Sequence, residues 1–525
     1  MLATRRSLYL STAAFLLYVG IGLVRSRYAP FMSLASGAYE YIRPSGDTDL
    51  NRRRTLIDIL DDDSLLNIFY HCRPGLLEED GSDIGDIDNK LLEGGRWERE
   101  RWWYKLAQVC RRWRHLILAS PSHLRLSLVC MSGTPVADML AHSPPIPLII
   151  DHIHTFETIT VEDQKGILLA LAHRDRVRRI RLRMHVSPLT RLIAAIDGSF
   201  PLLEYMYIQP LTVPHTNWSL PSTFRAPLLH HLVLLNFAFP ISSPLPTGLV
   251  TLSLEYIHPS TNFGPGELLQ QLSLMPRLET FRISFDARFS TQDFEGQLLH
   301  RPVSTRVTLP NLRWLGFEGP SIYMEAVLPL ITMPLLKVTE IMYSEGLAVT
   351  SSILFTLQFM CRTESPKFRS IRVTFCKQRV VVTMYPHERA GMPTPRIKYF
   401  SRHPVRGLVS TVQVFDVIRT VTSEVELLTL EDETSFEWHE EFSIRTGWRE
   451  LLRSFIKVKT LHVSGSRLIE ALSRSLRPYD GESATELLPE LKVISCAKGS
   501  HVGQSFRSFI SVRRNAGFPV TLARR

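Results

Sequence analysis

The sequence lacks the cysteine content and cysteine spacing of a secreted or zinc-binding protein. It has 6 cysteines in 525 residues, and none of them forms a C-x-x-C pair. Most lie in apolar runs, where a free thiol behaves as a small hydrophobic group. This usage is typical of a reducing compartment, and it argues against a disulfide framework or a zinc ribbon.

The common catalytic motifs are also missing. The sequence has no P-loop, no G-x-S-x-G, no H-E-x-x-H and no G-x-G-x-x-G. Histidines cluster at 152–154 and 230–231, but neither cluster has the cysteine or carboxylate spacing of a metal site. We therefore expect a protein that is not an enzyme, with no cofactor, no metal and no small-molecule substrate.

Positive charge is in excess, yet the sequence has no basic tail. The net charge is +10, with 44% apolar and 21% charged residues, which is a globular composition. The stretch "RVRRIRLRM" at 176–184 could contact phosphate through Arg176, Arg178 and Arg183. No aromatic platform or nucleic-acid motif surrounds it, so nucleic-acid binding is a minor alternative.

One long hydrophobic run occurs, at the N-terminus. Leu8 to Val24 has 17 uncharged, mostly apolar residues between two pairs of arginines, which is the lower limit for a membrane-spanning helix. A signal peptide begins in the same way, but no small-x-small cleavage site follows closely. The run is also compatible with a helix buried in protein, or with an extension that is absent if translation starts at Met32. Residues 1–50 are interpreted as this segment and a linker.

Short strand-like stretches recur from about Leu126 to the end of the chain. They share a pattern close to L-x-x-h-x-h, where h is apolar, and alternation of this kind is the strand period. Seven stretches follow a proline and three do not: 201–208, 227–234, 276–283, 310–317, 334–341, 366–373 and 489–496, then 248–254, 425–430 and 458–463.

Helical stretches lie between these strands, at 189–197, 266–275, 324–333, 351–360 and 448–455. A unit of one strand and one helix cannot bury its own apolar face, whereas stacked units bury one another. The sequence therefore predicts an α/β fold in which residues 126–525 form a divergent leucine-rich-repeat-like solenoid. Residues 380–407 fit no unit and are expected to interrupt it. An ordinary α/β domain with a parallel sheet is the alternative.

The stretch from Lys105 to Arg125 combines an apolar stripe with a basic one. The apolar positions trace one face of a helix: Leu106, Val109, Cys110, Trp113, Leu116 and Ile117. The opposite face carries Arg111, Arg112, Arg114 and His115. Pro121 disfavours helical geometry at Ser120, so we expect the helix to end there.

A second amphipathic helix is predicted at 56–72. Asp61, Asp62 and Asp63 suit its N-terminus, and Leu65, Leu66, Ile68, Phe69 and Cys72 form its apolar face. The insert from Pro74 to Gly95 is acidic and poor in apolar residues, so it is predicted to be a flexible loop. Two such helices make a poor core, and they need a partner helix or the following domain.

Together these two segments resemble an F-box. Leu60, Leu65, Leu66, Ile68 and Phe69 match its first part, and Val109, Cys110, Arg111, Trp113 and Pro121 match its V-C-[RK]-x-W part and the turn that follows. Asp61 stands where the family usually has proline, and the insert is longer than its normal connection. The chain after about Asn51 looks like the large basidiomycete F-box families with divergent leucine-rich repeats.

The resemblance implies a function in ubiquitin ligation. F-box proteins bind a Skp-type adaptor and, through it, a cullin complex, so residues 55–125 would hold the adaptor and residues 126–525 an unknown protein substrate. The implied adaptor-binding residues are Leu60, Leu65, Leu66, Ile68, Phe69, Val109, Cys110, Trp113 and Pro121. The chain would face the cytosol, anchored by residues 8–24, or lie in the nucleus or cytoplasm if that segment is not used. The competing hypotheses are a membrane-anchored repeat scaffold without a ligase role and a basic nucleic-acid-binding repeat protein.

Overall fold

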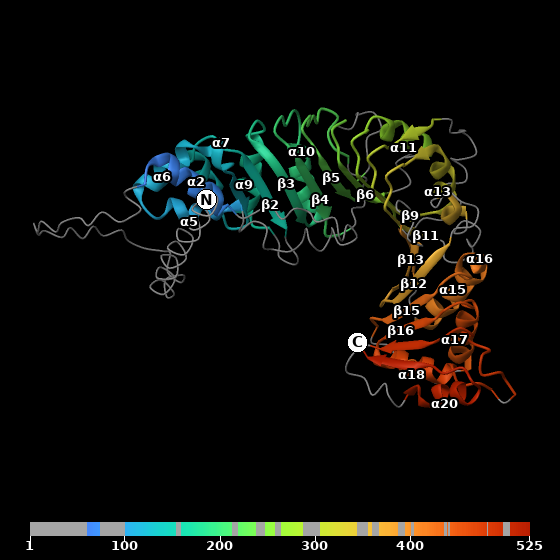
Figure 1. The fold of residues 1–525 in the computed structure, drawn as a ribbon. Coiled ribbons are helices and arrows are strands. Elements are labelled where there is room, and N and C mark those ends of the chain that lie inside the picture. Colours follow the sequence, from blue (N-terminus) through green and yellow to red (C-terminus); the bar gives the residue numbers. More distant parts are fainter. Residues whose placement is uncertain are drawn as a thin grey trace, which may run out of the picture. The chain divides into compact units, whose positions relative to one another are not determined.

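A computed structural model gives the fold of this chain (Figure 1). Asp62 to Arg525 forms one compact unit, which is described here by itself. The structure describes residues 60–73, 100–153, 159–212, 219–237, 247–257, 264–286, 305–343, 355–359, 367–386, 394–400, 404–434, 438, 442–479, 481–496 and 505–524.

Among the described residues, four helices precede the first strand, and one predicted helix is broken in two. They are α2 Asp62–Cys72, α5 Trp102–Ala107, α6 Arg111–Ala119 and α7 Pro121–Leu124. The continuous helix expected from Lys105 onward was wrong, because the backbone is extended at Cys110 and a new helix begins there. The Cys110 Sγ accepts a hydrogen bond from the Trp113 N–H at 3.5 Å. The predicted end at Ser120 is confirmed.

One large sheet contains sixteen strands of the described residues. Neighbouring strands are parallel except where β13 pairs with β12 and β14. In spatial order the strands are β1 Leu128–Met131, β2 Leu148–Ile153, β3 Val177–Met184, β4 Tyr205–Pro210, β5 His231–Leu235, β6 Thr251–Ile257, β7 Thr280–Phe285, β9 Trp314–Gly319, β11 Val338–Tyr343, β14 Thr394–Phe400, β13 Arg379–Pro386, β12 Phe368–Phe375, β15 Leu427–Asp432, β16 Thr460–Ser464, β17 Val493–Cys496 and β18 Thr521–Arg524. Outside this sheet, β8 Val307–Thr308 and β10 Ile331–Thr332 pair with each other.

Every strand-like stretch of the repeat pattern overlaps a strand of this sheet. The helices between them lie along one face of the sheet (Figure 1). They are α8 Val136–His142, α9 Val161–Ala172, α10 Val186–Ala195, α11 Pro265–Ser273, α13 Ser321–Val327, α15 Pro404–Val417, α16 Arg419–Thr422, α17 Phe442–Arg453, α18 Ser466–Ser475 and α20 Arg507–Asn515. Spatial order largely follows chain order and helices cover one face, so the α/β solenoid-like prediction is confirmed over the ordinary α/β domain.

Alternation along each strand separates a covered face from the face opposite the helices, which we call the open face. In β7 and β9, Phe285 and Phe317 point to the helices and meet Tyr323 of α13, whose ring centroid lies 4.7 Å from that of Phe285. The predicted helix at 324–333 ends at Val327. Leu328–Leu330 forms a 3₁₀ turn and β10 follows, because Pro329 has no N–H for the helical ladder.

The interruption expected at 380–407 is an antiparallel excursion of the sheet. After β12 the chain reverses into β13, and β14 returns parallel to β11. The array then resumes with β15, which pairs with β12. From there the repeat becomes regular, since β15, β16 and β17 begin at Leu427, Thr460 and Val493, each 33 residues after the last.

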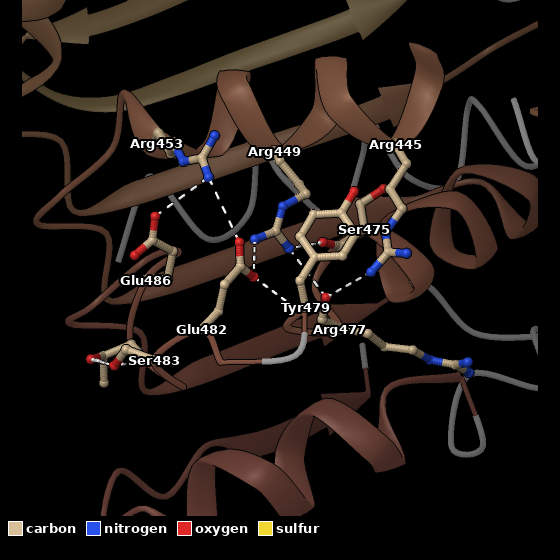
Figure 2. Close-up of polar contacts among 10 residues, drawn as sticks. Arg445, Arg449, Arg453, Ser475, Arg477, Tyr479, Glu482, Ser483 and Glu486 are labelled. Carbon is tan, nitrogen blue, oxygen red and sulfur yellow. Dashed lines mark hydrogen bonds and ion pairs between the residues drawn. The ribbon is translucent and has the colours of Figure 1, made fainter. Parts of the chain in front are cut away.

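A buried arginine joins two of these regular units. Arg449 of α17 has a side chain that is 2% exposed, and its guanidinium donates to the backbone oxygens of Ser475 and Arg477 at 2.9 and 3.1 Å (Figure 2). It also pairs with Glu482, and it lies 4.5 Å from the centroid of the Tyr479 ring. Arg449 thus contacts the segment after α18 at several points, and Arg445 of the same helix also donates to the Arg477 oxygen at 3.1 Å.

We expect Arg449→Met to destabilise the C-terminal units by about 3–5 kcal/mol, because it removes the buried guanidinium that donates to the Ser475 and Arg477 oxygens and pairs with Glu482. Arg453→Met is the matched control: it lies one turn further along α17 with a side chain 41% exposed, and it should cost at most about 1 kcal/mol. Denaturant unfolding would measure both. Equal stability of the two variants would contradict a structural role for Arg449.

The stabilisation that the Glu482 carboxylate provides in this contact should depend on pH. The N–H of Tyr479, which donates to the Glu482 carboxylate, lowers the pKa of Glu482, and Arg449 adds to this effect. The stabilisation by this carboxylate is therefore complete above its ordinary pKa of 4.5 and is lost as the pH falls through the lower folded-state value. The difference between wild type and Arg449→Met should shrink in that acidic range.

Candidate interaction site

The helices before the sheet pack around two aromatic side chains. Leu65 and Phe69 lie one turn apart on α2, and both are buried. Trp113 of α6 is also buried, and its ring meets Phe69 edge-on with centroids 4.8 Å apart. Leu65, Phe69 and Trp113, three of the nine proposed adaptor-binding residues, are therefore the core that holds α2 against α6.

The remaining predicted residues lie at the surface to different degrees. Val109 is 60% exposed and Cys110 is exposed, which corrects the prediction that both lie on the apolar stripe. The helix stops at Ala107, so these two residues leave the helical face before α6 begins. Leu60, Leu66, Ile68 and Pro121 are partly buried.

Tyr70 is an exposed aromatic residue that the sequence argument did not include. Its side chain is 42% exposed, and its ring centroid is 5.7 Å from that of His123 in α7. Tyr70 lies four residues after Leu66, so the two occupy the same flank of α2. This four-residue spacing from Leu66 was the sequence signal that could have identified Tyr70.

The basic side of α6 faces solvent, as expected. Arg111, Arg114 and His115 are exposed, and Arg112 pairs with Asp62 at the start of α2 at 2.7 Å. The Arg114 Nε donates to the Ala107 oxygen at 2.9 Å, across the break between α5 and α6. One arginine therefore supports that break, and another joins α6 to α2.

The helices are attached to the first strands of the sheet. The Trp103 Nε1 donates to the Ser127 oxygen at 3.3 Å in a buried contact, and Glu100 pairs with Arg179 of β3 at 2.9 Å. A surface pocket of about 230 Å³ lies at this junction, with Trp103, Leu118 and Pro144 in its wall. These contacts agree with the second of the two predicted ways of covering the helices, which were a partner helix or the following domain.

The basic strand at 176–184 is largely neutralised by its neighbours. Arg181 pairs with Asp151 of β2 at 2.9 Å, and Arg178 pairs with Glu204 at 2.9 Å. Arg176 donates to the backbone oxygens of Ile146 and Pro144. These contacts account for Arg176, Arg178 and Arg181 without a phosphate ligand, and none of them involves Arg183.

The hydrophobic N-terminal run and the acidic insert, residues 8–24 and 74–95, lie outside the described residues. Among the helices that the structure does describe, none is long and apolar enough to cross a membrane.

Comparisons with known proteins place this chain in no family. No family model matches the chain, and no curated protein matches it either. The solved structure of the leucine-rich repeat-containing protein LegL7 from Legionella pneumophila is similar over 75% of this chain and 99% of its own, with 10% sequence identity and a TM-score of 0.26.

Stacked repeats present long faces to other macromolecules. The α/β solenoid-like fold described above has such a face in the open face of its sheet.

We expect Trp113→Ala to unfold α2 and α6 locally, at a cost of about 3–5 kcal/mol, because it removes the largest buried ring of this small core. Val109→Ala is the control, and its effect should stay within about 0.5 kcal/mol. Hydrogen exchange of peptides covering Asp62–Leu124 would measure both. Unchanged exchange protection in Trp113→Ala would contradict the assignment of Trp113 to the core.

Proposed function

We propose that this chain is the substrate-recognition subunit of a Skp–cullin–F-box ubiquitin ligase. The observation that carries the proposal is the contact of Phe69 with Trp113. The two halves of the F-box-like pattern are separated in sequence by the acidic insert, yet their aromatic residues pack against each other. A working F-box would need its two halves to pack together in this way, although the insert separates them in the sequence.

The burial of the pattern residues supports a division of labour within the helices. Leu65, Phe69 and Trp113 face inward and hold the helices together. Val109 and Cys110 are exposed, while Ile68 is partly exposed, so these side chains remain available to a Skp-type adaptor. In this proposal the repeat array holds a protein substrate, and the partners carry out the ubiquitin chemistry.

The two competing functions have less support. A repeat scaffold without a ligase role would use the same array and treat the helices only as its N-terminal cap. A nucleic-acid-binding role would need free basic groups on β3, but Arg178 and Arg181 pair with Glu204 and Asp151.

We expect the double variant Ile68→Asp and Val109→Asp to lose the Skp-type adaptor in affinity purification from cells. Loss of one hot spot weakens binding by about 2 kcal/mol, or about 30-fold. Point variants are preferable to removing residues 55–125, because that deletion also removes Trp103, which is bonded to Ser127.

The matched control is Val161→Asp in α9. Val161 is 61% exposed and Val109 is 60% exposed, so the two substitutions place a charge at equally open sites. The adaptor should co-purify with Val161→Asp as with wild type. If the adaptor is absent from wild type, or remains with the folded double variant, the ligase role is wrong.

We also propose that residues 8–24 anchor the chain to a membrane, with residues 51–525 in the cytosol where an adaptor and cullin could bind. Wild-type protein should then pellet with membranes and resist carbonate extraction. Ala14→Arg with Leu17→Arg should abolish insertion, at about 2.5–3.5 kcal/mol per arginine, while adaptor binding is kept. Wild-type protein found wholly in the soluble fraction would exclude the anchor.

A further inference from the structure

The open face carries a small polar pocket lined by residues of five strands, β7, β9, β11, β14 and β13. Strand register sets Arg282 of β7 beside Gly316 of β9, and Gly316 beside Glu340 of β11. Lys398 of β14 lies beside Met342, two residues along from Glu340. These residues, with Glu318 and Arg379, line a pocket of about 30 Å³.

Gly316 forms the hollow. A Cβ at this position would lie 2.4 Å from Cη2 of Trp314 and 3.1 Å from Cγ of Arg282. The Trp314 ring therefore lies against the glycine, and a larger residue would displace it. A pocket of this size is far below the 300–1,000 Å³ typical of a whole small-molecule ligand. It suits the head group of one side chain, presented by a chain that crosses the open face.

Glu340 gives the pocket an acceptor. The residue is 7% exposed, and its Oε1 accepts from the Lys398 ammonium. No donor among the described residues reaches its Oε2. A buried carboxylate oxygen without a donor costs free energy, so a ligand N–H at this position would be favourable.

The remaining charges restrict which ligand can supply that N–H. Arg379 is exposed at the rim and Lys398 lies within, and Arg282 is paired at 3.6 Å with the buried Glu255. Burial lowers the pKa of Lys398, and the Glu340 carboxylate opposes that shift. Cations on this side repel an ammonium, and Glu340 and Glu318 repel a carboxylate. A neutral group that both donates and accepts satisfies both sides.

We propose that this pocket binds the carboxamide of an asparagine or glutamine side chain in the protein substrate. The NH₂ group would donate to the Glu340 Oε2, and the carbonyl oxygen would accept from the Arg379 guanidinium. The inference rests on the proposed function in one respect, namely that the array holds a protein substrate. It specifies the chemistry of one contact within that substrate.

The test uses the full chain and three small probes of similar size: propionamide, propionate and propylammonium. Saturation-transfer NMR should detect propionamide preferentially. Arg379→Ala should weaken propionamide binding about tenfold, because a hydrogen bond to a charged group is lost. Lys377→Ala is the matched control, since Lys377 is also an exposed cation, lies two residues before Arg379 in the β12–β13 turn, and does not line the pocket.

Gly316→Ala provides a second, steric variant, because its methyl group fills the hollow, and a thermal melt would check its fold. Equal signals from the three probes, or the same propionamide signal in Arg379→Ala as in Lys377→Ala, would overturn the proposal and leave the pocket as a structural charge network. The result is independent of the adaptor purification. Adaptor binding without amide binding rejects the pocket alone, and amide binding without the adaptor rejects the ligase role alone.

Discussion

The structure depends on one constraint: each strand and its helix can bury their apolar side only against the next unit. Phe285 and Phe317 come from neighbouring strands and share the Tyr323 ring, so none of the three is covered by its own unit alone. The parallel ladder then fixes the register, because a shift of one residue would turn the apolar side chains to the open face. Stacking of the units does not require a regular number of residues between successive strands. The 34-residue interval from β7 to β9 and the antiparallel excursion through β13 both preserve the stacking.

Stacking also explains how a chain with a net charge of +10 accommodates its arginines. Equivalent positions of successive units lie side by side, so a charge in one unit meets its counterpart in the next. Glu424 pairs with Lys457 and Glu426 pairs with Lys459, in both cases across 33 residues. Such exposed pairs each contribute little. These pairs favour the correct strand register, because a register that placed like charges directly opposite each other would be repulsive. The pairing of Arg181 with Asp151 applies the same rule on the open face, where both side chains are nearly buried.

The sequence allowed the repeated strands to be predicted, because apolar alternation behind a proline is local information. It also predicted the helix end at Ser120, since Pro121 acts on its immediate neighbour. The break between α5 and α6 escaped prediction, because Val109 and Cys110 continue the helical spacing of apolar residues while the backbone there leaves the helix. Contacts between distant residues were out of reach: Glu340 and Lys398 are 58 positions apart, and only the return of β14 beside β11 brings them together. Tyr70 was missed although its spacing from Leu66 was readable.

The attachment of the helices to the sheet bears on how the proposed ligase subunit would work. An adaptor-binding element on a flexible tether could bring a substrate near the ligase but could not orient it. Here Trp103 is bonded to the segment that enters β1, and Glu100 is paired with β3. The core of Leu65, Phe69 and Trp113 is therefore continuous with the first units of the array, and not a separate domain on a linker. If an adaptor binds the exposed residues around Val109, the first strands of the array are fixed relative to it. A substrate side chain bound on the open face would then be presented from a scaffold that packed side chains join to the adaptor. The stability of the junction between the helices and the first strands would determine how well the substrate is positioned, as much as the affinity of the adaptor site or of the open-face site.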